Sequence, residues 1–188
     1  MLNFKRTLFT LIPVSLIFLA VESTPTANPP SEPVFVQEYI GQMDFIEGRL
    51  TQLLGAMSQN QISWTPAEGV RTDGQIYLHV AEANYMLAGF MSGAQMEGGP
   101  GAKEKKTTDK DEINKILKES FTTVKEAAGK LTEEDLNKVV KTPFGMDMSL
   151  RNFMISLLCH CHEHLGQAIA YARMNGVTPP WSKKESEG

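Results

Sequence analysis

From residue 34 onward, hydrophobic residues recur every three or four positions along the chain. The first such series comprises Val36, Ile40, Met43, Ile46, Leu50, Leu53, Leu54 and Met57. Because an α-helix turns by about 100° per residue, this spacing places all of them on one face. The pattern predicts a first helix from about Val34 to Ser58.

Three further segments show the same periodicity. The stripe of the second helix, which ends near Gly93, comprises Thr72, Ile76, His79, Ala83, Met86 and Phe90. The third helix stops at Gly129, and its stripe comprises Ile113, Ile116, Leu117, Phe121, Val124 and Ala128. The fourth helix has Ser149 as its N-cap and ends at Gly176, ahead of two prolines. Polar or glycine-rich stretches, including a turn over residues 131–141, connect the helices.

The predicted fold class is all-α. We find no run of alternating apolar residues that would indicate a strand. Four helices of about 20 to 27 residues are typical of a four-helix bundle. Two of the connections are long, so the pattern leaves the handedness of the bundle open.

The N-terminal segment "MLNFKRTLFTLIPVSLIFLAVES" has early basic residues, an apolar run and small residues near Ser23. These features predict a signal peptide over residues 1–23 and an exported protein, periplasmic or extracellular. The alternative is an uncleaved membrane anchor, since the apolar run is short for a span but is lengthened by its neighbours. We predict a Pro-rich linker over residues 24–33, the helical bundle over residues 34–181 and a polar tail over residues 182–188.

Length and charge narrow the classes of partner. The chain has 188 residues, a formal net charge of −4 and a pI near 5.6. One domain of this charge has no general attraction to nucleic acids or anionic membranes. We therefore expect no nucleic-acid partner, and no membrane partner for the mature domain unless the N-terminal segment stays uncleaved.

The stretch "LCHCHEHLGQAIAYARMNG" holds three of the four histidines and both cysteines. On a helix His160, His164, Gln167 and Tyr171 share one stripe with apolar residues one and two turns earlier, which predicts that this stripe faces the interior. His162 and Glu163 point outward. Cys159 and Cys161 lie about 100° to either side of His160, too far round to share an ion with the stripe. Their divergent Cβ directions also argue against a disulfide.

Two histidines at i,i+4 can bind one metal ion, but this spacing alone is a weak signal of a metal site. The alternative interpretation is that both histidines are buried and hydrogen-bonded to neighbouring residues. His79 adds to it, because it lies midway along the apolar stripe of the second helix. A neutral imidazole in a bundle interior needs a polar partner. The sequence thus predicts that His79 meets His160 and His164 at one metal ion.

Three stretches, "WTPAEGVRT", "RTDGQIYLHVAEANYML" and "HCHEHLGQAIAYARMNGVTPP", resemble motifs of the DinB/YfiT-like metalloenzyme family. The resemblance covers most of residues 34–181. It implies an up-and-down bundle of unusual connectivity with a divalent metal held by the same three histidines, and Gly166 and Gln167 also match. The chain departs from the family at Leu165, where arginine is common, and in its signal segment.

Three neutral histidines leave a coordination position open, as in catalytic zinc sites, where bound water becomes more acidic or a thiolate can bind. Glu82 is a candidate general base, although a solvated boundary carboxylate is the favoured interpretation. Gln167 is a candidate hydrogen-bond donor behind the metal ligands, and Tyr171 is expected only to pack in the core.

These observations predict an exported metal-dependent enzyme that acts on a small-molecule substrate by hydrolysis or thiol-dependent transfer. Low-molecular-weight thiols are scarce outside the cytoplasm, so export favours hydrolysis. The alternative is a non-enzymatic metal- or ligand-binding bundle protein. The expected cofactor is zinc or nickel, with iron or manganese possible, and a homodimer is possible.

Overall fold

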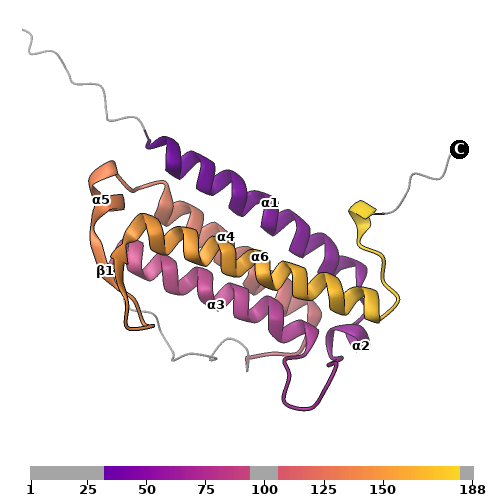
Figure 1. Ribbon diagram of the computed structural model, residues 1–188. Coiled ribbons are helices and arrows are strands. Elements are labelled where there is room, and N and C mark those ends of the chain that lie inside the picture. Colours follow the sequence, from indigo (N-terminus) through magenta and orange to yellow (C-terminus); the bar gives the residue numbers. More distant parts are fainter. Residues whose placement is uncertain (1–31, 94–105, 183–188) are drawn as a thin grey trace, which may run out of the picture.

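The computed structural model describes residues 32–93 and 106–182 (Figure 1). The predicted signal peptide, most of the predicted linker and nearly all of the polar tail lie outside the described residues. The long helices are α1 (Val34–Ala56), α3 (Asp73–Ser92), α4 (Lys110–Ala128) and α6 (Leu150–Met174). The short elements are α2 (Gln59–Ile62), α5 (Glu133–Asn137), β1 (Val139–Lys141), β2 (Asp147–Ser149) and the 3-10 helix η1 (Pro180–Ser182). Within the described ranges, no helix combines the length and apolar character needed to cross a membrane.

Side-chain caps mark the start of each described α-helix except α1. Thr72 accepts a hydrogen bond from the backbone of Gln75 at the start of α3, and Gly93 ends that helix with a left-handed φ of 72°. Ser149 caps α6, which confirms its predicted role. The first helix ends slightly earlier than predicted, at Ala56, because Ser58 forms a capping box that begins the separate short helix α2.

The segment predicted as a turn, residues 131–141, contains α5 and strand β1, and β1 forms a β-hairpin with β2 in the residues that follow. After α5, strands β1 and β2 pair antiparallel with Val139 opposite Ser149 and Lys141 opposite Asp147. Gly145, at φ 79°, lies in the connecting turn. The all-α prediction is therefore wrong for this segment, because strands of three residues are too short to show an alternating pattern.

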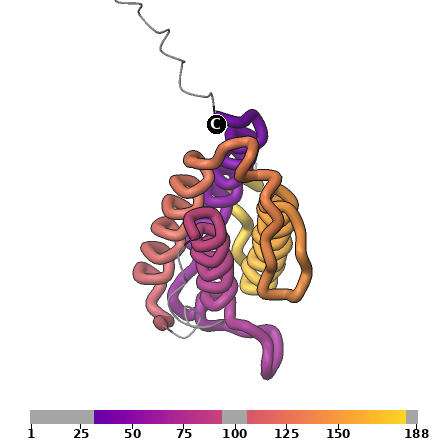
Figure 2. Tube along the Cα trace, turned by 90° about the vertical axis from the view of Figure 1, so that its left-hand side faces the viewer, coloured from indigo at the N-terminus to yellow at the C-terminus, as the bar shows by residue number. Residues whose placement is uncertain are grey.

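The four long helices form a ring in which α3 packs against α4 and α6, and α1 packs against the other sides of α4 and α6. Figure 2 shows α3 with α4 on one side and α6 on the other. Helix α3 is buried on most of its sides, with buried residues from Asp73 to Ala88. Helix α3 therefore contributes both to the core, through these buried residues, and to the candidate site, through His79.

Cross-helix contacts give the directions of the helices. Asn84 of α3 bonds Ser120 of α4, and Gly74, nearly three turns earlier on α3, lies beside Ile113, which is also earlier on α4. Helices α3 and α4 are therefore parallel. By contrast, Phe90 meets Phe153 at the start of α6, so α3 and α6 are antiparallel. Figure 1 shows the same directions. The up-and-down arrangement that the family resemblance implied is therefore wrong for α3 and α4, which run the same way.

A polar seam, which we define as Asn84, Ser120 and Cys161, joins three helices inside the core. The Asn84 amide donates to the Ser120 hydroxyl at 3.1 Å, and the Cys161 thiol donates to the Asn84 oxygen at 3.7 Å. All three residues are buried. The seam therefore gives the buried Asn84 amide its partners from α4 and α6, whereas the Ser120 hydroxyl also donates to the Leu117 carbonyl within α4 at 2.6 Å.

Candidate metal centre

Three histidines from two helices converge at one place. His79 comes from α3, and His160 and His164 lie one turn apart on α6. The His79 ring centroid is 5.0 Å from that of His160 and 4.7 Å from that of His164, and the two α6 rings are 4.4 Å apart. One nitrogen from each ring lies within 4.8 Å of the others, and the described residues contain no second group of three or more such ligands.

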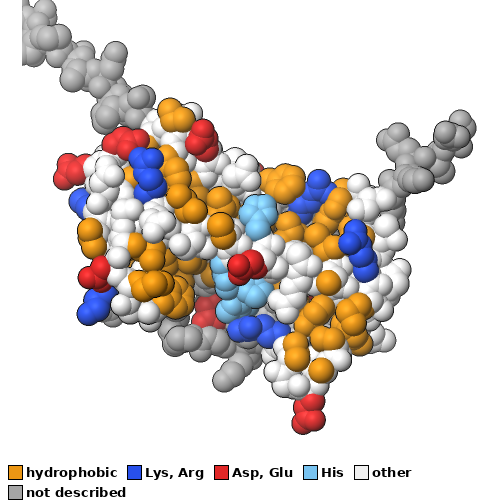
Figure 3. All heavy atoms as spheres, viewed as in Figure 1, with side chains coloured by type: hydrophobic (Ala, Val, Ile, Leu, Met, Phe, Trp, Pro, Cys, Tyr) orange, Lys and Arg blue, Asp and Glu red, His pale blue; other side chains and the backbone are white. Residues whose placement is uncertain are grey.

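The histidines lie at the margin of the core, which corrects the predicted direction of the interior. All three are half-buried. The fully packed side of α6 carries Met154, Leu157, Cys161, Leu165 and Ala168, and its centre is rotated by roughly 100° from His160. Phe153 and Tyr171 are buried although they share the histidine stripe, because their long side chains reach the core from its edge. Figure 3 shows the histidines at the surface of the face viewed, so a ligand has access to them.

Gln167 fixes the orientation of His164. The His164 Nδ1–H donates to the Gln167 Oε1 at 2.9 Å, and the Gln167 amide nitrogen donates to the Tyr171 hydroxyl at 3.2 Å. Because an amide oxygen only accepts, this arrangement leaves the Nε2 lone pair of His164 available for a metal ion. Gln167 was predicted as a hydrogen-bond donor behind the metal site, but its amide oxygen accepts from His164 and its amide nitrogen donates to Tyr171.

Tyr171 therefore does more than pack in the core. Its ring lies edge-on to Trp64 at 5.5 Å, and its hydroxyl holds the Gln167 amide in the orientation that receives the His164 proton. The sequence contained the i,i+4 spacing of Gln167 and Tyr171, which is the signal that could have indicated this contact.

We expect Gln167→Ala to weaken metal binding by about tenfold to a hundredfold, because the orientation of His164 is lost. Gln167→Glu keeps an acceptor and should bind metal nearly as tightly as the wild type. Competition with a chelator of known affinity measures both variants. The control is Gln37→Ala, which removes an exposed glutamine from α1. Equal affinities of Gln167→Ala and wild type would contradict the assigned role.

The protonation of His160 fits a metal ligand. The pKa of His160 is lowered from 6.5 to about 4, chiefly by burial and also by the neighbouring His164, His79 and Arg71. The ring is therefore neutral at neutral pH, as metal ligation requires. The donor set of three imidazoles suits a borderline divalent ion such as zinc.

Two further side chains belong to the surroundings of the site. The Arg71 Nη2 lies 3.3 Å from the His79 Nδ1. A cationic side chain is therefore present beside the histidines, although position 165, where the family commonly has arginine, is a leucine buried in the core. Glu82, which follows His79 by three residues, is only 7% exposed. The interpretation of Glu82 as a solvated carboxylate is therefore wrong.

The residues that helical geometry excluded do not join the histidine group. His162 is exposed and lies 6.4 Å, centroid to centroid, from the Phe45 ring of α1. Cys159 and Cys161 are both free thiols, as predicted, with Cys159 exposed. The sequence did not predict the burial of Cys161 or its contact with Asn84, because the predicted inward face of α6 was centred on the histidines and not on the side that carries Cys161.

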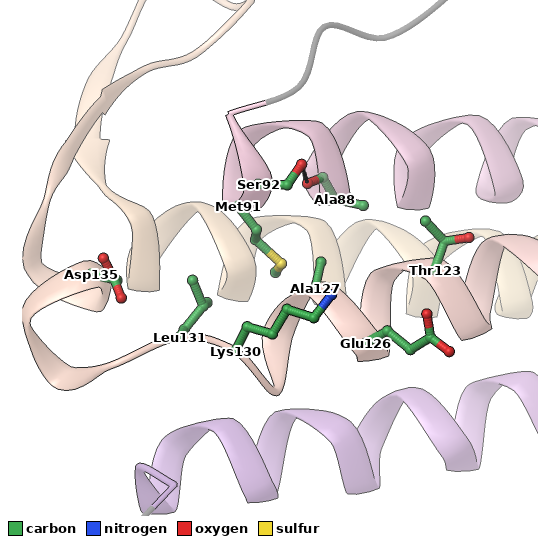
Figure 4. Close-up of a pocket in the computed structure, with 9 residues that line it drawn as sticks. All are labelled: Ala88, Met91, Ser92, Thr123, Glu126, Ala127, Lys130, Leu131 and Asp135. Carbon is green, nitrogen blue, oxygen red and sulfur yellow. Dashed lines mark hydrogen bonds between the residues drawn. The ribbon is translucent and has the colours of Figure 1, made fainter. Parts of the chain in front are cut away.

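Two pockets lie away from the histidines. The larger, of about 280 Å³, is at the C-terminal ends of α3 and α4 beside α5 (Figure 4). Its lining residues are Ala88, Met91, Ser92, Thr123, Glu126, Ala127, Lys130, Leu131 and Asp135. A smaller pocket of about 150 Å³ lies between the start of α3 and the residues before α4. Neither is lined by a histidine, so the candidate chemistry lies at the accessible histidine group and not in these pockets.

Several solved structures have the same fold. A DinB-like protein from Bacillus cereus aligns with a TM-score of 0.65 and 21% identity over 77% of this chain and 95% of its own. YfiT from Bacillus subtilis, described as a probable metal-dependent hydrolase with an unusual four-helix bundle topology, aligns with a TM-score of 0.62 and 17% identity over 82% and 94%. A DinB-like protein from Bacillus subtilis, YjoA, aligns with a TM-score of 0.59 and 18% identity over 75% and 94%. A comparison with curated protein sequences gives no match.

The sequence itself matches a family model, that of the DinB superfamily, over residues 42–168. This range is more than half of the chain, and it contains α3, α4 and all three histidines of the candidate site. The protein therefore belongs to the DinB superfamily.

Proposed function

We propose that this protein is an exported metal-dependent hydrolase of small molecules, in which His79, His160 and His164 hold one divalent ion. The observation that carries the proposal is the convergence of three half-buried histidines. No fourth histidine, cysteine or acidic residue among the described residues is part of this group. Three protein ligands with an open position are typical of catalytic zinc sites, whereas structural sites are closed by four. The fold shared with YfiT, described as a probable metal-dependent hydrolase, supports the proposal.

Zinc or nickel is the proposed ion, because imidazole nitrogens favour these metals. When bound, such an ion supplies Lewis acidity that polarises a substrate carbonyl or phosphoryl group and makes water a usable nucleophile near neutral pH. The protein's own contribution is to hold the ligands. Gln167 orients His164, and the antiparallel packing of α3 on α6 brings His79 level with the α6 pair.

Glu82 is the proposed proton acceptor. It follows His79 on α3 and is nearly excluded from solvent, an environment in which a carboxylate can act as a general base. Glu163 has the same sequence spacing to His160 but is exposed. We therefore favour Glu82 over Glu163 for this role.

We expect Glu82→Gln to lower turnover by about a hundredfold or more while leaving metal content unchanged, because a base acts in the transition state and a ligand acts in the ground state. Turnover and metal content are measured on the same sample. Glu163→Gln is the matched control and should keep both. Unchanged turnover in Glu82→Gln would remove this residue from the mechanism.

The experiment that tests the proposed function is a hydrolysis screen with metal-loaded protein against simple esters, amides and thiol adducts. Each substrate is tested with and without a chelator and with and without an added low-molecular-weight thiol. Chelator-sensitive hydrolysis without thiol supports the proposal. Strict dependence on the thiol would indicate a transferase, and stoichiometric metal without any turnover would favour the non-enzymatic alternative.

Export is tested separately by the mass of the protein recovered from the cell envelope and the medium. A mature chain beginning at Thr24 supports cleavage after Ser23. An intact chain in the membrane fraction would indicate the uncleaved anchor.

A further inference from the structure

Arg71 lies in the loop just before α3 and contacts a proposed metal ligand. Its Nη2 is 3.3 Å from the His79 Nδ1, and the side chain is partly buried. A guanidinium has only donors, so in this contact the His79 Nδ1 accepts and its lone pair is engaged by Arg71. Figure 3 shows a basic side chain directly beside the histidines.

The contact between Arg71 and His79 is incompatible with a bound ion. An ion on the His79 Nδ1 would need the lone pair that Arg71 engages. An ion on the Nε2 of a neutral ring would leave the proton on Nδ1, where it would face another donor. In both arrangements the guanidinium must turn away from His79 when an ion binds, yet it stays close to the ion because it is attached just ahead of the same helix.

We propose that Arg71 then binds an oxyanion of the substrate, a carboxylate or a phosphate, beside the open coordination position. The inference rests on the proposed function, since it requires an ion at the three histidines. An ion and a guanidinium placed together repel each other, and an oxyanion between them is attracted to both. The planar fork of an arginine matches the two oxygens of a carboxylate or phosphate, which makes it a selective partner for that group.

The two ligands of the site should respond in opposite directions to Arg71→Gln. Removing the positive charge should raise the affinity for cobalt(II) by a few-fold, because the ion no longer competes with or repels a neighbouring cation. The affinity of the cobalt(II)-loaded protein for acetate and for inorganic phosphate should fall by about tenfold or more, because a charge-assisted hydrogen bond is lost. A purely structural role of Arg71 would weaken both.

The test uses the full chain loaded with cobalt(II), with acetate and inorganic phosphate titrated separately and followed by the visible absorption of the ion. Comparing the two anions shows which oxyanion the site prefers. Arg71→Lys keeps the charge without the fork and should recover wild-type cobalt(II) affinity but only part of the anion affinity. Arg173→Gln, which removes an exposed arginine from the last turn of α6, is the charge-matched control and should change neither.

Circular dichroism shows whether each variant is folded, and Arg71→Lys remains informative if Arg71→Gln is not. Full cobalt(II) uptake together with unchanged binding of both anions in the Arg71 variants would overturn this inference alone. A wild-type protein that takes up no cobalt(II) would overturn the metal site and this inference with it. The two failures are therefore distinguished before any anion is added.

Discussion

Replacing His79 by alanine is expected to lower the bound metal from about one ion per chain to background, because a zinc site with two protein ligands is far weaker than one with three. His79 is the histidine that α3 contributes to the group, and without it only the one-turn pair on α6 remains. His160→Ala and His164→Ala should have the same effect. Elemental analysis after gel filtration in metal-free buffer measures the result.

His162→Ala is the matched control, since it removes an exposed histidine from the same helix. It should keep the full metal content and nearly the wild-type stability. Stoichiometric metal in His79→Ala would contradict the cross-helix site. It would show instead that the tract around Cys159 and Cys161 binds the ion locally.

Asp73→Asn is expected to stabilise the protein at pH 8. Asp73 is fully buried at the first position of α3, and neither carboxylate oxygen has a hydrogen-bond partner among the described residues. Burial raises the pKa of Asp73 from 3.8 to about 7. The protonated form is therefore favoured in the folded state, and the stability present below pH 3.8 is lost as the pH rises through 7. The difference of roughly three pKa units corresponds to about 4 kcal/mol at most.

Urea unfolding at pH 4 and pH 8 measures this effect. The wild type should lose up to about 4 kcal/mol more than Asp73→Asn between the two pH values, whereas an asparagine at 73 has no charge to bury. Asp111→Asn, in the exposed first turn of α4, controls for the general effect of removing an acid. Parallel pH dependence in wild type and Asp73→Asn would show that Asp73 is solvated or paired in the folded protein.

The four long helices and the group of three histidines could be predicted because each has a local signal. Apolar periodicity located the helices, and Ser149 and Gly93 marked helix ends through capping chemistry. His160 and His164 share a face by spacing alone, and His79 lies on a recognisable stripe. These features depend on neighbours within a few residues, so a sequence contains them.

The remaining features depend on residues distant in the sequence. The parallel pairing of α3 and α4 follows no local rule, because a long connection permits either direction. The interior direction of α6 was predicted from Phe153 and Leu157, but Phe153 reaches the core from its edge and Leu157 lies between the histidine stripe and the packed side. The same displacement concealed the burial of Cys161. The contact of Arg71 with His79 depends on the course of a loop, for which no periodicity exists.

The polar seam has a consequence for how this protein can evolve. Apolar helix faces can slide by one turn, about 5.4 Å, and still bury one aliphatic side chain against another. Asn84 cannot, because such a slip would take the Ser120 hydroxyl and the Cys161 thiol away from its buried side-chain amide, and each polar group left unpaired costs about 1–3 kcal/mol. Cys161 adjoins His160, and Asn84 is five residues beyond His79, so the helix alignment that satisfies the seam also brings the three histidines level. Among relatives with this helix order, apolar core residues can therefore be substituted independently of one another, whereas positions 84, 120 and 161 should change together. Their covariation would indicate the same alignment of the helices even in a descendant that has lost its histidines.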